Sequence, residues 1–171
     1  HQILCGGQRT SGTEKQLTDK WSLSFVESAP AINSTYILDN IQTWETLNND
    51  TAKIMMGTGV YTTTVNMTKD EAKAKWAINL GDVRESARVY VNDNFVGCAW
   101  SVPFILDCKD AFKAGKNTLR IEVTNLPANR ISEMDRQGVK WRKFDEINVV
   151  DINYKKTSYA NWEAVKSGLN S

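Results

Sequence analysis

Short runs in which apolar and polar residues alternate one for one recur along this chain, and they restrict its fold more than any other feature. Trp21, Leu23 and Phe25 alternate with serines, and residues 119–124 repeat the pattern. Successive side chains of a strand point to opposite faces, so a period of two predicts strands with one buried side. Runs that alternate in this way, or that are rich in β-branched residues, occupy residues 21–25, 60–67, 76–80, 88–91, 95–96, 104–108, 119–124 and 150–154.

These runs are separated by turn residues, and no long helical period interrupts them. Asn92-Asp93-Asn94 has the short polar side chains that a tight hairpin favours. Many short strands joined by turns predict an all-β fold, an antiparallel β-sandwich. Residues 70–75 and 161–166 each predict a turn of helix, the second ended by Gly168, and the charged residues 129–146 predict a long loop. We expect residues 1–20 to form a loose lead-in and residues 21–171 to form a single β-sandwich domain.

The charge balance and the apolar runs bear on two classes of partner. The chain has 21 Lys and Arg against 20 Asp and Glu, a net charge of +1. Duplex binding needs a basic surplus clustered on one surface. A membrane-spanning helix needs about 20 consecutive apolar residues, and the chain has no such run. The sequence therefore predicts neither a nucleic-acid partner nor a membrane span.

The residues needed for most hydrolytic sites are scarce. The sole histidine is His1, at the first position, so the chain lacks the fixed imidazole that Ser-His-Asp and Cys-His sites require. Paired carboxylates suffice for glycoside hydrolysis, and acidic residues gather in the charged segment. There they alternate with Arg and Lys, which indicates solvated ion pairs, so we expect no catalysis by this chain. These acidic residues are Glu133, Asp135, Asp145 and Glu146.

Cys5, Cys98 and Cys108 are the three cysteines. An odd number without CxxC spacing argues against a zinc site and against a disulfide framework. Cys98 and Cys108 either form a bridge between neighbouring strands or remain free thiols, and the sequence leaves both alternatives open.

An ordered series of short motifs resembles the sugar-binding-type β-sandwich domain that accompanies catalytic domains in glycoside hydrolases. The series occupies residues 57–61, 80–83, 87–92, 96–97, 103–107, 115–119 and 123–125. Further motifs resemble Bacteroidetes proteins of glycoside hydrolase family 106, which are typically α-L-rhamnosidases with this module at the C-terminus. They occupy residues 129–131, 135–142, 152–155 and 161–162, and the resemblance extends over residues 17–171.

The resemblance implies a galactose-binding-like jelly roll, a non-catalytic module of a larger secreted hydrolase, and a bacterial periplasmic or extracellular location. Many such domains hold a structural ion. Ca²⁺ needs six to eight oxygen ligands, and no run of this sequence has the spaced Asp and Asn residues of a dedicated calcium-binding loop. The sequence therefore leaves the presence of a metal ion undecided. We also expect the parent protein to continue beyond Ser171 and to add an edge strand.

Tryptophans are the candidate contacts for a sugar, because an aromatic face stacks on the C–H face of a pyranose. Trp141 lies among Arg130, Asp135 and Arg142, whose polar groups could reach hydroxyls, and Trp100 lies near a predicted loop. Trp162 is a weaker candidate, whereas Trp21 and Trp76 alternate with small or polar residues and are expected in the core. The predicted partners are a carbohydrate, such as plant-type polysaccharide, or the parent catalytic domain. In the second case the module is a structural buttress without a sugar ligand.

Overall fold

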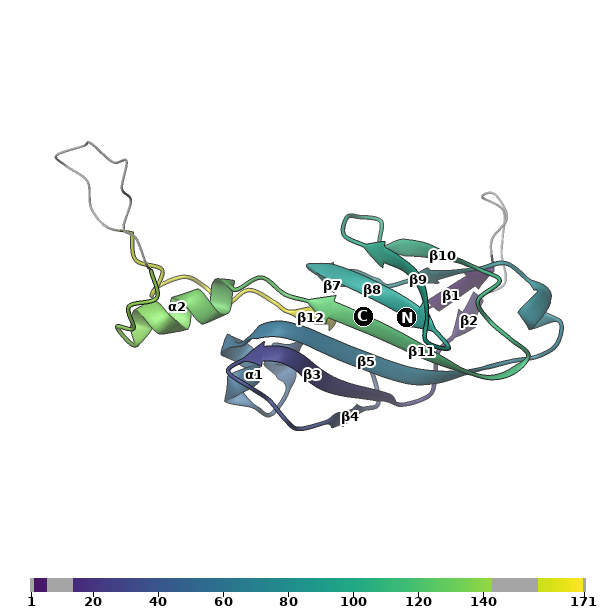
Figure 1. The fold of residues 1–171 in the computed structure, drawn as a ribbon, viewed down its shortest axis with the longest axis horizontal. Coiled ribbons are helices and arrows are strands. Elements are labelled where there is room, and N and C mark those ends of the chain that lie inside the picture. Colours follow the sequence, from purple (N-terminus) through teal and green to yellow (C-terminus); the bar gives the residue numbers. More distant parts are fainter. Residues whose placement is uncertain (1, 6–13, 143–156, 171) are drawn as a thin grey trace.

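The computed structural model describes residues 2–5, 14–142 and 157–170. Figure 1 shows the long strands lying side by side along the molecule, with α2 projecting at one end. The larger sheet has six antiparallel strands in the order β4-β3-β5-β11-β8-β9. Their bounds are Tyr36–Leu38, Trp21–Ala29, Met56–Met67, Gly115–Thr124, Ser86–Val91 and Asn94–Ala99.

The smaller sheet has four antiparallel strands in the order β10-β6-β1-β2. Their bounds are Ile105–Lys109, Trp76–Asn79, Gln2–Cys5 and Glu14–Gln16. The expected antiparallel β-sandwich is thus confirmed. The first 20 residues were expected to be a loose lead-in, but β1 and β2 pair with each other and β1 pairs with β6. Strands of four and three residues are too short to establish a period, so the sequence pattern does not reveal β1 and β2.

The core lies along the inner face of the larger sheet. One row of directly opposed residues, Leu23, Tyr61, Ile121 and Val89, crosses four strands, and each of the four is 0% exposed. Trp76 and Ile78 of β6 are also buried. Trp21 is buried as well, so the prediction that Trp21 and Trp76 belong to the core is confirmed.

The β8–β9 hairpin follows the turn chemistry of its sequence. Asn92 and Asp93 have φ angles of 50° and 63°, and Val91 pairs with Asn94 across the turn. Asn and Asp tolerate this left-handed conformation, which a two-residue hairpin requires at both positions. Asn92 Nδ2 also donates a hydrogen bond of 2.8 Å to Asn117 Oδ1. The turn prediction is confirmed.

Short helical segments lie between strands. They are η1 (Trp44–Thr46), α1 (Asp50–Ile54) and η2 (Glu71–Lys73), and η2 falls within the predicted helical turn at 70–75. The second expected helical turn, at 161–166, is wrong, because this segment is irregular and leads into a strand. Gly168 begins β12 (Gly168–Asn170), which pairs with β7 (Asp82–Arg84), rather than ending a helix.

A buried polar cluster holds β12 against the sandwich. The Tyr61 hydroxyl accepts hydrogen bonds from Trp44 Nε1 at 2.9 Å and from the Leu169 N–H at 3.3 Å, and donates to the Gln42 carbonyl at 3.2 Å. Burial raises the pKa of Tyr61 to about 12. A Cβ on Gly168, whose φ is +93°, would lie 2.5 Å from Trp44 Nε1, so only glycine fits there.

Cys98 and Cys108 are free thiols, so the alternative of a bridge between them is not realised. Cys98 is exposed on β9, and Cys108 is buried on β10. Burial raises the pKa of Cys108 to about 12, so it is an unreactive thiol at neutral pH.

The charged segment 129–146, expected to be a loop, instead begins within a helix, α2 (Ala128–Arg136). Its buried positions are Asn129 and Ser132, which are polar, and this is why no apolar period revealed the helix. The predicted strand at 150–154 lies outside the described residues, as do residues 143–146. The domain boundary at residue 20 remains a prediction.

Candidate functional site: an aromatic arm at one end of the sandwich

The projection seen in Figure 1 is built from α2 together with residues 137–142 and 157–166, and we call it the arm. Helix α2 ends at Arg136, and its C-terminus is closed by Gly138, whose φ is 68°. The Gly138 N–H donates to the Asp135 carbonyl, and the Val139 N–H donates to the Met134 carbonyl. This paired arrangement is a Schellman motif, which a glycine at this position favours. The chain therefore turns sharply after α2, toward Trp141.

Two side-chain amides hold the arm, one within it and one at its base. Asn129 Nδ2 donates to the Val165 carbonyl at 2.7 Å, and the Val165 N–H donates to Asn129 Oδ1 at 2.8 Å. This pair joins the outgoing helix to the returning strand segment. Asn125, at the base, donates to the Met55 carbonyl and to Ser167 Oγ and accepts from the Gly57 N–H. Both amides are buried, and each uses its nitrogen and its oxygen in hydrogen bonds, so they hold the arm in one position.

Three aromatic rings contact one another in series on the arm. The centroids of Trp141 and Tyr159 are 6.1 Å apart, and those of Tyr159 and Trp162 are 4.5 Å apart with their planes at 76°. The Arg142 guanidinium lies 4.8 Å from the Trp141 centroid and 5.0 Å from that of Tyr159. Edge-to-face rings and a cation over a ring face attract each other, so this cluster is cohesive.

The polar groups near Trp141 are used to hold the arm together. Asp135 Oδ1 accepts a hydrogen bond from Trp141 Nε1, and Asp135 Oδ2 accepts one of 2.7 Å from the Tyr159 N–H. Arg142 donates to the Thr157 carbonyl at 2.8 Å. The carboxylate and the guanidinium that were expected to reach sugar hydroxyls therefore bond first to the arm itself.

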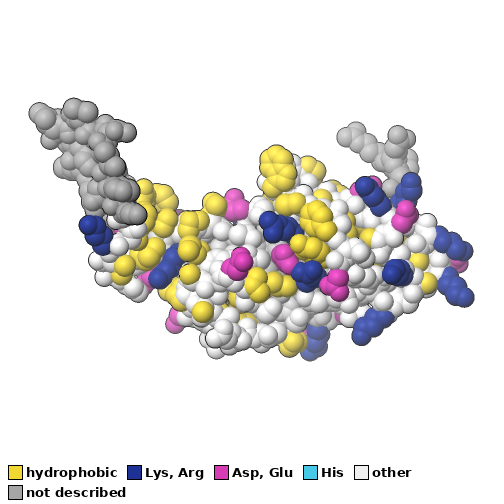
Figure 2. All heavy atoms as spheres, viewed as in Figure 1, with side chains coloured by type: hydrophobic (Ala, Val, Ile, Leu, Met, Phe, Trp, Pro, Cys, Tyr) yellow, Lys and Arg dark blue, Asp and Glu magenta, His cyan; other side chains and the backbone are white. Residues whose placement is uncertain are grey.

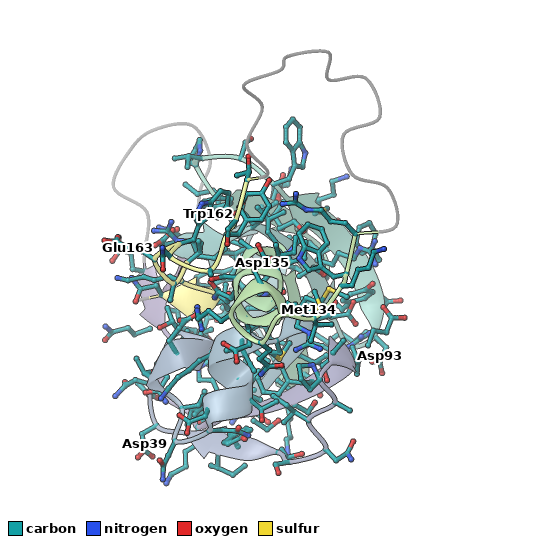
Figure 3. All side chains as sticks on the ribbon, turned by 90° about the vertical axis from the view of Figure 1, so that its left-hand side faces the viewer. Asp39, Asp93, Met134, Asp135, Trp162 and Glu163 are labelled. Atoms are coloured by element: carbon teal, nitrogen blue, oxygen red, sulfur yellow. The ribbon has the colours of Figure 1, made fainter. Side chains whose placement is uncertain are left out.

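The rings border a pocket with a volume of about 260 Å³, which we call the apolar hollow. Its lining is Leu126, Pro127, Ala128, Ile131, Trp141, Tyr159 and Trp162. Trp162 is 52% exposed. Figure 2 shows hydrophobic side chains gathered at this end, with Lys and Arg beside them, and in Figure 3 Asp135 and Trp162 lie on the same side of α2. An exposed aromatic in a concave setting is a candidate binding surface.

A second concave surface of about 320 Å³, the polar hollow, lies beside the first. Its lining is Asp135, Gly138, Val139, Lys140, Thr157 and Ser158. A smaller recess of about 40 Å³ between Lys140 and Arg142 adjoins it and is also bordered by Asp135 and Trp141.

The structure brings three of the five predicted site residues together: Trp141, Asp135 and Arg142. Arg130 lies on the same helix but borders neither hollow. Trp100 is elsewhere, in the loop between β9 and β10, where it is 77% exposed. The sequence did not single out Tyr159, which lies 18 residues beyond Trp141 and meets it only after folding. Its spacing of three from Trp162 is the one signal that could have found it.

Among the described residues, no three or more His, Cys, Asp or Glu side chains lie close enough together to hold a metal ion. None of the helices in this part of the chain is both long and apolar enough to cross a bilayer.

Proteins similar to this chain include glycoside hydrolases. A protein of Formosa agariphila named "Putative beta-glucuronidase" is 29% identical over 90% of this chain, which spans 15% of that protein's length. A rhamnosidase structure from a Novosphingobium species superposes with a TM-score of 0.68 at 24% identity, over 90% of this chain and 14% of that one. A β-glucuronidase from Ruminococcus gnavus gives a TM-score of 0.56 at 15% identity, over 65% and 22% of the two chains.

These two solved structures share the fold of this chain. The family model described as glycosyl hydrolase 2 galactose-binding domain-like matches residues 35–165, which include most of the sandwich and the whole described part of α2. The chain therefore belongs to the glycosyl hydrolase 2 galactose-binding domain-like family.

Proposed function

We propose that this chain is a non-catalytic module of a larger glycoside hydrolase and that it binds carbohydrate on the arm. The observation that supports this most directly is the apolar hollow, where Trp162 and Tyr159 meet nearly at right angles. A pyranose presents a C–H face to an aromatic ring, and a rigid sandwich commonly carries such sites on its connecting segments. The hydrogen bonds of Asn125 and Asn129 keep the rings in position before a ligand arrives.

The identity of the parent protein is part of the proposal. The relatives named above include a glucuronidase and a rhamnosidase. Because the motifs in the C-terminal third resemble glycoside hydrolase family 106, we place the module near the C-terminus of an α-L-rhamnosidase-like enzyme. That enzyme would act on plant-type polysaccharide in the bacterial periplasm or outside the cell.

A calorimetric and glycan-array screen of this chain tests the proposal. We expect binding of at least one glycan and no turnover of aryl glycosides, the rhamnoside included. Trp162→Ala should abolish the binding, because the exposed indole provides the ring platform. Trp100→Ala is the matched control, because it removes an equally large exposed indole outside both hollows. Hydrolysis that a single carboxylate substitution eliminates would contradict the non-catalytic assignment.

A structural buttress for the catalytic domain is the second candidate, and a separate observation favours it. Trp100 and Val102, in the loop between β9 and β10, are 77% and 81% exposed. Apolar side chains this exposed are typical of surfaces covered by a protein partner. In the full-length hydrolase, Trp100→Ala should then lower the melting temperature of the catalytic domain. In the isolated module, the same substitution should change the melting temperature little.

A further inference from the structure

The apolar hollow and the polar hollow share a wall formed by three side chains. Asp135 borders the polar hollow and bonds to Trp141 Nε1 and to the Tyr159 N–H. Trp141 and Tyr159 border the apolar hollow. The two surfaces are thus neighbours, and the hydrogen bonds in the wall fix their spacing.

The sizes of the two surfaces suit one ligand better than two. Ligand pockets usually measure about 300–1,000 Å³. The apolar hollow, about 260 Å³, and the polar hollow, about 320 Å³, are each at the lower end of this range or below it. Together they fall well within it. Each has room for one ring-sized group, and a ligand that occupies both needs two linked rings.

The two linings differ in charge. The apolar hollow has no charged side chain in its lining. The polar hollow and its recess carry Lys140, Arg142 and Asp135, which is two positive charges against one negative, a balance of +1. Both Asp135 oxygens already accept hydrogen bonds from the wall. The Lys140 ammonium is therefore the group best placed to meet an anion.

From this juxtaposition we propose that the arm binds a glycan segment of at least two sugar units, one neutral and one acidic. The neutral ring packs in the apolar hollow against Trp162 and Tyr159. The acidic sugar lies in the polar hollow, where its anionic group meets Lys140 and its hydroxyls meet Ser158 and Thr157. This inference rests on the proposed carbohydrate-binding function and adds the length and charge of the ligand.

Titration calorimetry of this chain with four probes tests the inference. They are a disaccharide that joins a neutral sugar to a uronic acid, the same disaccharide with its carboxyl group reduced to an alcohol, and the two free monosaccharides. We expect the acidic disaccharide to bind about tenfold more tightly than its reduced form, because a hydrogen bond to a charged group is stronger than a neutral one. Monosaccharides should bind more weakly still.

Two lysine variants separate the charge assignment from general attraction. Lys140→Gln should remove the preference for the acidic disaccharide, so that the acidic and the reduced disaccharide bind with similar affinity. Lys166→Gln is the matched control, because Lys166 is exposed on the same arm and borders neither hollow. Trp162→Ala should abolish binding of both disaccharides.

The possible failures are distinguishable. If none of the probes and no glycan on the array binds, the proposed carbohydrate-binding function is wrong. If monosaccharides bind as tightly as disaccharides, the function stands and the two-unit site is wrong. Equal effects of Lys140→Gln and Lys166→Gln would refute the assignment of the anion to Lys140.

Discussion

Replacing Tyr61 by phenylalanine removes one oxygen that takes part in three hydrogen bonds in the core. The ring keeps its place, but the Trp44 indole N–H and the Leu169 N–H lose their acceptor, and the Gln42 carbonyl loses a donor. Trp44, Tyr61 and Leu169 are each 0% exposed, so water cannot take over these bonds without opening the structure. The variant therefore tests whether this hydroxyl holds β12 in place.

The magnitude follows from the two orphaned donors. A buried donor left without a partner costs about 1–3 kcal/mol. The bond from Leu169 is long, at 3.3 Å, and belongs at the lower end of that range. We therefore expect Tyr61→Phe to lower the free energy of unfolding by about 2–4 kcal/mol. For a domain of this size the melting temperature should fall by roughly 5–15 °C.

Urea unfolding followed by tryptophan fluorescence measures the change, and Tyr90→Phe is the matched control. Tyr90 lies half-buried on the outer face, with the Arg120 guanidinium 4.0 Å from its ring, an interaction that phenylalanine retains. We expect the control to change the free energy by less than about 0.5 kcal/mol. If the two variants are equally stable, the hydroxyl of Tyr61 does not hold β12 and the reasoning is refuted.

The ionisation of Tyr61 predicts how the stability of the domain changes at alkaline pH. The pKa of Tyr61 rises from 10.0 to about 12 because the ionised form is poorly solvated in the core. The unfolded chain therefore loses this proton first, and stability that is complete below pH 10 declines as the pH rises toward 12. Tyr61→Phe should remove this part of the decline. An identical pH profile in the variant would show that Tyr61 ionises equally in both states.

Three further substitutions test other parts of the structure. Gly168→Ala should lower the free energy of unfolding by more than about 3 kcal/mol, because the added Cβ would lie 2.5 Å from Trp44 Nε1. Gly115→Ala is the control for backbone strain, because Gly115 has a similar φ and nothing within 4 Å of an added Cβ; equal losses of stability in denaturant would contradict the clash. Glu45→Gln should raise the melting temperature, because both carboxylate oxygens are buried with no hydrogen-bond partner among the described residues. Glu163→Gln, at an exposed position, is the control, and a lower melting temperature of Glu45→Gln would mean that the Glu45 carboxylate is paired. Trp141→Ala should lower the free energy of unfolding by about 1–3 kcal/mol, through lost burial; a variant that keeps its stability but loses a demonstrated ligand would show that Trp141 serves the ligand alone.

The sequence predicted those strands whose two faces lie in different surroundings. Leu119, Ile121 and Val123 face the core while Arg120 faces the solvent, so the alternation is complete and β11 was found. The three-residue strands β2, β4, β7 and β12 were missed, because three residues are too few to establish a period. Their pairing depends on backbone hydrogen bonds to neighbours that only the folded chain provides.

Only part of the candidate site on the arm could be predicted from the sequence. Trp141, Asp135 and Arg142 lie within eight positions of one another, so their grouping could be expected from the sequence. Tyr159 and Trp162 join them only because α2 and the returning segment are held together by Asn129. The helix was missed because polar side chains fill its buried face. The isolated position of Trp100 could not be inferred, because alternation does not reveal at which end of a sandwich a loop lies.

The seating of β12 has a consequence for synthesis on the ribosome. Leu169 bonds to Tyr61, 108 positions earlier, and the Trp44 N–H bonds to the Ser167 carbonyl. Trp44 and Tyr61 therefore leave the exit tunnel before their hydrogen-bond partners do. The Ser167 carbonyl and the Leu169 N–H are still inside the tunnel at that time. A chain that stops before residue 167 would leave β7 without its partner strand, an exposed edge that other strands can enter. Emergence of residues 167–170 from the tunnel is thus the event that completes this edge of the sandwich.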